Sequence, residues 1–319
     1  MSVVRLGTAD LSVIEPLVHV YAFKSYRNYR VLARKAQSAV MLAEIEETLA
    51  REAGIVLRIE SGKGQAIAIS RTLEWESQFF GMPMGRIEYL LASDRDLLPD
   101  ALESAVEGLR ERGVQHVSTR VDVADIAAMA LAEAHDFRLM DSLVTYTQRP
   151  RKEPPNDVRE VGTIRDFRTA DGPELLQIAA EAYRGFRGRF HLDPHIPDDR
   201  CDAFYVEWAR QSIAMTMADM ILVSEGADGQ LLGFLAFRRR EPVSSAGGVA
   251  VYGGGLGACR IDTPGAYAGL IRAGTIWAHQ RNAVAECQTQ NYNFPTIRIY
   301  EAVGAHYVRA EYTLHRWLG

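Results

Sequence analysis

An asparagine and a tyrosine near the end of the chain, Asn293 and Tyr300, stand seven residues apart in a stretch expected to be helical. At about 3.6 residues per turn, this spacing brings both side chains almost onto one face of the helix. A structural explanation is that Asn293 caps the helix while Tyr300 packs in the core with its hydroxyl at the surface. A chemical explanation is that the tyrosine hydroxyl donates a proton in a reaction. The surrounding sequence has to decide between them.

A second group of reactive side chains lies in the segment FRGRFHLDPHIP. It combines Arg189, His191 and Asp193 in a loop that is expected to connect two helices. Arginines suit a nucleotide diphosphate, and His191 or Asp193 could receive the proton of an amine, directly or through water. For each single residue the alternative is a hydrogen bond that only fastens the loop. The histidines have no third ligand at a suitable spacing, so no metal is expected.

The composition limits the class of protein. The chain has 319 residues, of which 47% are hydrophobic, and a formal net charge of −5. This suits one large domain or two of ordinary size, and the absence of a Lys/Arg tract argues against a nucleic-acid partner. No apolar run reaches the roughly 18 residues of a membrane span, and the start MSVVRLGTADLSVIEP does not have the pattern of a signal peptide. We therefore expect a cytoplasmic protein with reduced cysteines and no membrane partner.

Four segments follow from the periodic runs and the residues that interrupt them. Residues 1–54 are expected to form an N-terminal helical segment, a cover or an oligomer arm, which leaves a homodimer possible. Strands and helices alternate over 55–150. The polar stretch QRPRKEPPNDVRE, with three prolines, indicates a linker over 151–162, and 163–319 repeats the pattern at greater length. Alternating elements with antiparallel hairpins among them predict an α/β or α+β sheet.

The two halves resemble each other at their ends. Residues 117–146 align with residues 285–314 in the order strand, short helix, strand. In this alignment Asp125 stands opposite Asn293, and Ala132 stands opposite Tyr300. The first half therefore has the same order of elements and lacks the tyrosine. This is expected after a duplication in which one copy lost its catalytic residues.

The second half, from Thr163 to Gly319, resembles the GNAT acetyltransferases. The whole chain resembles the amino-sugar nucleotide branch of this family, typified by dTDP-fucosamine acetyltransferase. The stretches LEWESQFFGMPMGRI, FRGRFHLDPHIP and TLHRWLG carry the closer match. The resemblance implies tandem GNAT-like halves, each a twisted mixed sheet flanked by helices, with a degenerate first half. It also implies that acetyl-CoA lies between the fourth and fifth strands of the second half.

The resemblance assigns residues to acetyl-CoA. The family loop (Arg/Gln)-x-x-Gly-x-(Gly/Ala) corresponds to Asp262–Tyr267, which keeps Gly265 and departs at both ends. A helix N-terminus there suits a pyrophosphate, and Arg260 or Arg272 could supply the missing positive charge. The family pattern Asn-x-x-Ala-x-x-x-Tyr corresponds to Asn293 on the pantetheine arm and Tyr300 facing the sulfur, with Thr296 in place of Ala. The expected cofactor contacts are Leu256, Ala258, Arg260, Gly265, Ala266, Tyr267 and Asn293.

We therefore expect an acetyl-CoA-dependent N-acetyltransferase that acts on a nucleotide-linked amino sugar. Acetyl-CoA is the cosubstrate, the amine attacks the thioester directly, Tyr300 protonates the leaving thiolate, and His191 is a candidate base. The expected acceptor contacts are Phe80, Arg189, His191 and Asp193. Two alternatives stay open: a different amine acceptor, either a small molecule or a protein, and a non-catalytic acyl-CoA-binding protein, which the acidic Asp262 would suit.

Overall fold

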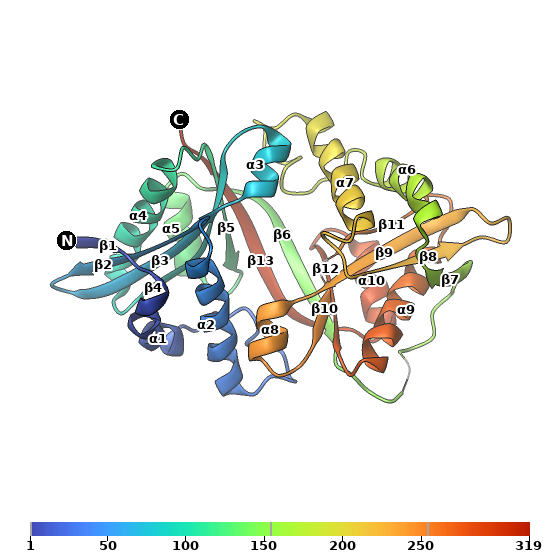
Figure 1. Ribbon diagram of the computed structural model, residues 1–319, viewed down its shortest axis with the longest axis horizontal. Coiled ribbons are helices and arrows are strands. Elements are labelled where there is room, and N and C mark those ends of the chain that lie inside the picture. The colour runs from blue at the N-terminus through green and yellow to red at the C-terminus, as the bar shows by residue number, and fades with distance from the viewer. Residues whose placement is uncertain (1, 154, 254) are drawn as a thin grey trace. The chain divides into compact units, whose positions relative to one another are not determined.

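The computed structural model describes residues 2–153, 155–253 and 255–319. The chain folds into two compact units (Figure 1). Unit 1 comprises Met1–Arg27, Leu32–Ser142 and Ala310–Gly319, and unit 2 comprises Asn28–Val31 and Leu143–Arg309. In the described part of the chain, no helix is both long enough and apolar enough to cross a bilayer.

The sheet of unit 1 has the strand order β1-β2-β3-β4-β5-β13. Its strands are β1 (Ser2–Arg5), β2 (Gly54–Ser61), β3 (Gly64–Thr72), β4 (Met84–Ala92), β5 (His116–Asp122) and β13 (His306–Trp317). Neighbouring strands are antiparallel except β4 and β5, which run parallel. The sheet is therefore mixed, as expected.

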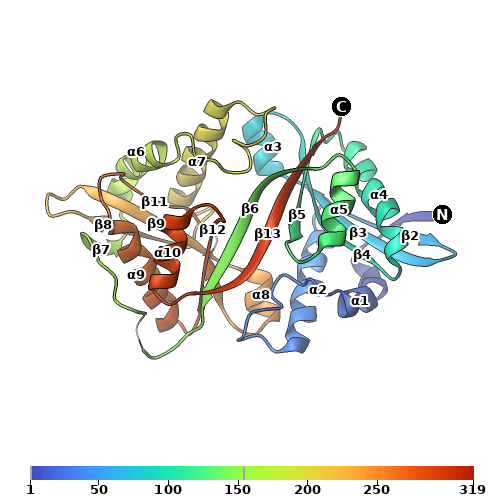
Figure 2. The ribbon, with the colours of Figure 1, turned by 180° about the vertical axis from the view of Figure 1, so that it is seen from behind.

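Helices cover both faces of this sheet (Figures 1 and 2). They are α1 (Leu11–Val20), α2 (Arg34–Ala50), α4 (Leu98–Arg110) and α5 (Ile126–Ala134), while α3 (Glu74–Phe80) joins β3 to β4. Side chains of β2 alternate between two cores: Ile55 and Ile59 pack with Leu102 of α4, whereas Val56 packs with Met41 of α2. Because successive side chains of a strand point to opposite faces, a strand covered on both sides needs consecutive apolar residues where both covers reach it, as at Ile55 and Val56.

The sheet of unit 2 has the order β6-β12-β10-β9-β8-β7, and β11 pairs with β9. Its strands are β6 (Arg138–Gln148), β7 (Thr163–Asp166), β8 (Met220–Glu225), β9 (Leu231–Arg239), β10 (Val251–Gly253), β11 (Gly257–Cys259) and β12 (Val284–Gln290). Its helices are α6 (Gly172–Ala182), α7 (Asp198–Ile213), α8 (Glu241–Ala246), α9 (Ala266–Gln280) and α10 (Phe294–Ala302). Helix α9 is fastened to the sheet by Leu270, which packs with Leu222 and Phe237.

Each unit completes its sheet with a strand from the other half of the sequence. Strand β6 follows α5 along the chain, yet it pairs with β12, from Leu143 opposite Gln290 to Gln148 opposite Ala285. Strand β13 follows α10, yet it pairs with β5, from Glu311 opposite Asp122 to its end. Both strands are divided between the units: β6 belongs to unit 2 from Leu143 on, and β13 belongs to unit 1 from Ala310 on. The paired parts of these two strands are therefore exchanged between the two halves of the sequence.

The expected fold class is confirmed, since both units are mixed sheets flanked by helices. The predicted N-terminal segment 1–54 differs in two ways: it joins the sheet of unit 1 through β1, and its helix is interrupted after α1. At the end of α1 the Lys24 ammonium donates to the carbonyl oxygens of His19 and Tyr21. The run of residues 249–260 contains two strands, β10 and β11. Gly254 within it, and Pro154 of the predicted linker, lie outside the described residues.

Candidate active site in the second unit

Two neighbouring strands of unit 2 separate and leave a wedge between them. Among the described residues, strands β10 and β12 pair in parallel at Val251 with Val284 and at Tyr252 with Ala285. Beyond this point β11 pairs with β9, and β12 pairs with β6. Gly253 marks the point of separation, where an added Cβ would lie 2.5 Å from the backbone oxygen of Glu286. The sequence therefore needs a glycine where the strands approach most closely.

The hydrogen bonds of β11 show which of its backbone groups face away from β9. The Leu256 carbonyl accepts a bond of 2.7 Å from the Ala236 amide, and the Arg260 amide donates to the Leu232 carbonyl at 2.9 Å. Because backbone groups of alternate residues point to opposite sides of an antiparallel strand, Ala258 also faces β9.

The backbone groups of Gly257 and Cys259 consequently face away from β9. This orientation agrees with the Tyr183 hydroxyl, which donates to the Gly257 carbonyl at 2.7 Å. The backbone groups of Leu256 and Ala258, which the sequence proposed as contacts, are thus directed to β9, whereas those of Gly257 and Cys259 lie on the other edge. A sequence pattern locates a strand but does not reveal which edge each amide faces.

Three tyrosine hydroxyls gather in the wedge. Tyr300 is 2% exposed, and its hydroxyl donates to the Gln288 carbonyl of β12 at 3.2 Å. The hydroxyl of Tyr267, from the first turn of α9, shares a hydrogen bond with that of Tyr300, and the Tyr267 ring lies against Gly257. Burial raises the pKa of Tyr183, Tyr267 and Tyr300 above the ordinary value of a phenol. All three therefore carry their protons at neutral pH.

Two cysteines border the same wedge, one on each strand. Cys259 belongs to β11 and Cys287 to β12. Burial raises the pKa of each thiol to about 12, so both are protonated at neutral pH. Since the thiolate is the nucleophilic form of cysteine, neither residue is suited to covalent catalysis.

Asn293 precedes α10 as its N-cap residue, with Tyr300 two turns further along the helix. Its side chain makes no capping hydrogen bond; its amide nitrogen donates instead to the Thr289 hydroxyl at 3.0 Å. The structural explanation of Asn293 as a side-chain cap is therefore wrong. The side chain is half-buried beside the end of β12.

The loop before α9 keeps the turn that the sequence predicted. Gly265 is the N-cap residue with a φ of 106°, a conformation that favours glycine, and Ala266 behind it is buried. The first amides of a helix have no partner within the helix, so those of α9 can receive an anion. Asp262 is exposed, and it makes no hydrogen bond or ion pair within the described ranges. A Cβ on Gly265 would lie 3.2 Å from the carbonyl oxygen of Arg159, which is itself exposed.

The two arginines expected to supply positive charge have other partners. Arg260 is bound to Glu174 at 2.9 Å and lies 3.5 Å from Glu181, so it ties the end of β11 to α6. Arg272 is bound to Asp157 at 2.8 Å. Neither guanidinium can contact a pyrophosphate without giving up these ion pairs.

The loop that holds Arg189, His191 and Asp193 is fastened from inside. His191 is buried, its Nε2 lies 2.9 Å from Asp202 Oδ1, and its Nδ1 has no hydrogen-bond partner in the described chain. Asp193 is 1% exposed and accepts bonds from the backbone and the ring of His195. The Arg189 guanidinium lies over the Phe190 ring, 4.3 Å from its centre. Of these side chains, His191 combines burial with a nitrogen that is still open.

Phe80, the remaining predicted contact, ends α3 in unit 1. Its ring is half-buried and meets the ring of Phe79 edge to face at 5.0 Å. The other predicted site residues all belong to unit 2. An acceptor role for Phe80 stays a prediction.

Comparison with known proteins supports the architecture. A scan against protein-family models finds no match. The spore coat polysaccharide biosynthesis protein SpsD of Bacillus subtilis is 23% identical over 264 residues, which cover 82% of this chain and 86% of SpsD. A GCN5-related N-acetyltransferase from Sphaerobacter thermophilus matches with a TM-score of 0.64 at 14% identity, over 99% of this chain and 95% of that one.

A second solved structure has the same tandem arrangement in its description. A tandem GNAT protein from the clavulanic acid biosynthesis pathway, in a structure without AcCoA, matches with a TM-score of 0.59 at 15% identity. The match covers 100% of this chain and 98% of that protein. The chain therefore has the fold of tandem GNAT acetyltransferases, and the predicted resemblance is confirmed at the level of the fold.

Proposed function

We propose that unit 2 transfers an acetyl group from acetyl-CoA to a primary amine, with Tyr300 as the general acid. The observation that carries the proposal is the buried Tyr300 hydroxyl, protonated at neutral pH and held in the wedge between β11 and β12. A phenol in this position can protonate a leaving thiolate. The hydrogen bond shared with Tyr267 fixes the position of the Tyr300 hydroxyl.

The residues around the wedge fit acetyl-CoA in most respects. Acetyl-CoA supplies a thioester whose thiol leaves when an amine attacks. The open edge at Gly257 and Cys259 offers backbone groups to the amides of the pantetheine arm or to the acetyl carbonyl. The first amides of α9 suit the pyrophosphate, although the loop residue expected to be basic is Asp262. Positive charge must then come from outside the loop, and Arg159 lies beside it.

His191 is the candidate for accepting the amine proton. Asp202 accepts a hydrogen bond from His191 Nε2, which leaves the lone pair on the buried Nδ1. The His191 ring is stacked on Tyr205 with centres 6.0 Å apart, and Tyr205 is stacked on Tyr183 at 4.5 Å. Because Tyr183 binds the Gly257 carbonyl, this stack connects His191 to the open edge of β11.

For the acceptor we propose the amine of a nucleotide-linked amino sugar. The name of the relative SpsD, a protein of spore coat polysaccharide biosynthesis, supports a sugar acceptor. Arg189 is then a candidate for the diphosphate. The alternative within the same reaction class is another small-molecule or protein amine.

Mass spectrometry of the purified protein with acetyl-CoA tests the proposal. Amino-sugar nucleotides, free amino sugars and simple amines serve as acceptors, and Tyr300→Phe serves as the inactive control. The expected result is a mass gain of one acetyl group on an amino-sugar nucleotide with wild-type protein only. Acetylation of other amines alone would retain the reaction and reject the acceptor, and no acetylation with any amine would reject the reaction.

A further inference from the structure

Unit 1 contains a wedge of its own between corresponding strands. Strands β4 and β5 pair in parallel from Met84 opposite His116 to Ile87 opposite Thr119. Beyond these residues β4 pairs only with β3, and β5 pairs only with β13, among the strands that the structure describes. The first half has therefore kept the separation of strands, although it has lost the tyrosine.

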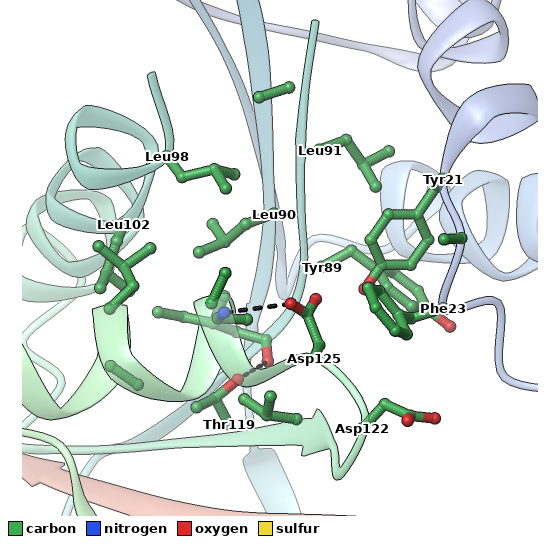
Figure 3. Close-up of a pocket in the computed structure, with 18 of the residues that line it drawn as sticks. Tyr21, Phe23, Tyr89, Leu90, Leu91, Leu98, Leu102, Thr119, Asp122 and Asp125 are labelled. Atoms are coloured by element: carbon green, nitrogen blue, oxygen red, sulfur yellow. Dashed lines mark hydrogen bonds between the residues drawn. The ribbon is translucent and has the colours of Figure 1, made fainter. Parts of the chain in front are cut away.

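This wedge encloses a cavity of about 200 Å³ (Figure 3). An apolar cavity of about 150 Å³ is large enough for benzene. The cavity therefore has room for one ring or a chain of about six carbons. Its apolar walls come from five parts of unit 1: the end of α1 with the residues that follow it, β4, α4, β5 and α5.

The cavity exists because small residues replace large ones. Ala128 and Ala132 line it, and in the alignment of the two halves they stand opposite Thr296 and Tyr300. In unit 2 the Tyr300 ring is buried in the corresponding wedge. Loss of that ring in the first half left space that neighbouring side chains do not fill.

One wall of the cavity is aromatic. Tyr21, Phe23 and Tyr89 form a cluster in which Tyr21 meets the other two rings edge to face, at 6.0 and 6.3 Å. Figure 3 shows these rings on one side of the cavity and the leucines Leu90 and Leu102 on the other. The faces of aromatic rings attract cations, whereas the leucines accept only an apolar group.

Most charged groups that line the cavity are already paired. Glu88 is bound to Arg71 at 2.7 Å, and its pKa is held below the usual range by Arg86, Arg71 and Arg120, which outweigh its burial. Asp122 is bound to Arg27 through both carboxylate oxygens.

Asp125 is different, because no Lys, Arg or His in the described ranges forms an ion pair with it. Its Oδ1 accepts one hydrogen bond, from the Ala128 amide at 3.1 Å. Figure 3 shows its carboxylate between the aromatic wall and the leucines. Two arginines also line the cavity: Arg120 of β5, whose charge acts on Glu88, and the exposed Arg95, which is flanked in the sequence by Asp94 and Asp96.

The residues before α4 exclude a pyrophosphate. Where unit 2 has Gly265 before α9, unit 1 has Asp94 and Asp96 before α4, and Asp100 lies in its first turn. The Asp94 side chain already accepts the Asp96 amide at 3.0 Å. Carboxylates at a helix N-terminus repel a phosphate-bearing ligand. The occupant of this cavity is therefore not a coenzyme A thioester.

We propose that the cavity of unit 1 binds a small primary amine with an apolar body of about six to eight heavy atoms. The ammonium group is held by the Asp125 carboxylate and the neighbouring aromatic rings, and the apolar body lies between Leu90 and Leu102. Unit 1 has Asp125 where unit 2 has Asn293, and this accounts for the carboxylate at the cavity. It has Ala132 where unit 2 has Tyr300, and this accounts for the space. The proposal is independent of acetyl transfer in unit 2.

Calorimetric titration with hexylamine, hexanol and hexanoate tests this proposal. Hexylamine is expected to bind once per chain, with hexanol and hexanoate at least about tenfold weaker, because a hydrogen bond to a charged group is worth more than a neutral one. Equal binding of hexanol would show a cavity without charge selection. Tighter hexanoate would assign the charge selection to the arginines Arg95 and Arg120. Either result, or no binding of hexylamine, would overturn the proposal.

Three variants separate the proposed site from general stability. Asp125→Asn removes the charge and keeps a good N-cap, so it should weaken hexylamine about 10-fold to 100-fold without unfolding the protein. Ala132→Leu fills the cavity and should abolish binding. Ala130→Leu, on the exposed side of the same helix, should leave binding unchanged. Hexylamine affinity that survives both Asp125→Asn and Ala132→Leu would reject this cavity as the site.

Discussion

At the scale of single residues, removal of the Tyr300 hydroxyl distinguishes a catalytic role of this residue from a role in packing. Tyr300→Phe should lower kcat about 100-fold to 10,000-fold, because it removes the proposed general acid. Acetyl-CoA affinity should survive, because the lost contact matters chiefly as charge develops on sulfur. Steady-state kinetics with a thiol-detecting assay and a binding titration measure both quantities.

Tyr146→Phe is the matched control for this substitution. The Tyr146 ring lies 5.8 Å from that of Tyr300, but its hydroxyl donates to Glu301 at 3.2 Å. The variant should therefore keep normal kcat. Equal losses in the two variants would mean that the aromatic packing, and not the acid, sets the rate.

Arg159 is the second residue whose proposed role in binding can be tested apart from its effect on stability. If its guanidinium supplies the charge that Asp262 does not, Arg159→Ala should weaken acetyl-CoA about 5-fold to 10-fold, the value of one partly screened charge contact. Arg272→Ala should instead lower the thermal midpoint with little effect on affinity, because Arg272 is bound to Asp157. Unchanged affinity in the Arg159 variant would place the charge elsewhere.

Residue patterns located the helix that carries Tyr300 and the turn at Gly265, because each depends on local spacing; the roles of both residues stay predictions. The same patterns proposed Arg260 as a cofactor contact, although its guanidinium binds Glu174 of α6. That partner lies far away in the sequence, and only the folded sheet brings it near. Which strand edge carries the open amides was hidden for the same reason.

At the scale of elements, the start of α9 is a turn that tolerates little change. Gly265→Ala should destabilise the protein by about 1 to 2 kcal/mol, because its positive φ suits glycine and a Cβ would crowd Arg159. Gly269→Ala in the same helix is the control: its Cβ would meet Glu160 at an ordinary 3.5 Å. Since alanine favours a helix interior, this variant should be neutral or more stable by up to about 1 kcal/mol. Urea unfolding compares the two, and equal effects would refute the conformational argument.

The wedge between β11 and β12 predicts a loss of stability at alkaline pH. The pKa of the Cys259 and Cys287 thiols is 9.0 in the unfolded chain, and burial raises it to about 12 in the folded protein. Below pH 9 both states hold the protons and stability is constant. Between these two pKa values only the unfolded state releases the thiol protons, so the free energy of unfolding falls as the pH rises. The buried tyrosines extend the loss above pH 10.

Unfolding midpoints at pH 7, 8.5 and 10 measure this effect. The double variant Cys259→Ala, Cys287→Ala should lose less stability between pH 8.5 and 10 than the wild type. Cys201, whose pKa burial also raises to about 12, stays in both proteins and supplies a common background. A pH profile unaffected by the double variant would mean that the two thiols do not stay protonated in the fold.

At the scale of the whole molecule, the exchanged strands link the two halves of the sequence. Fragments 1–150 and 151–319, cut in the predicted linker, should each be unfolded or aggregated, because each lacks an edge strand. Co-expression should recover a folded pair, with native circular dichroism as the measurement. Two separately stable fragments would contradict the need for exchange. The sequence predicted the tandem fold class, but pairing across its two halves leaves no local signal.

The exchange also governs the order in which the chain can fold as it is synthesised. The edge of β5 receives its partner only when β13 has been made, about 190 residues later. At 5 to 20 residues per second, translation keeps the first sheet incomplete for roughly 10 to 40 s. During that interval β5 presents an unpaired edge to other chains. Nascent chains are therefore expected to depend on chaperones more than a protein whose first domain folds as soon as it emerges.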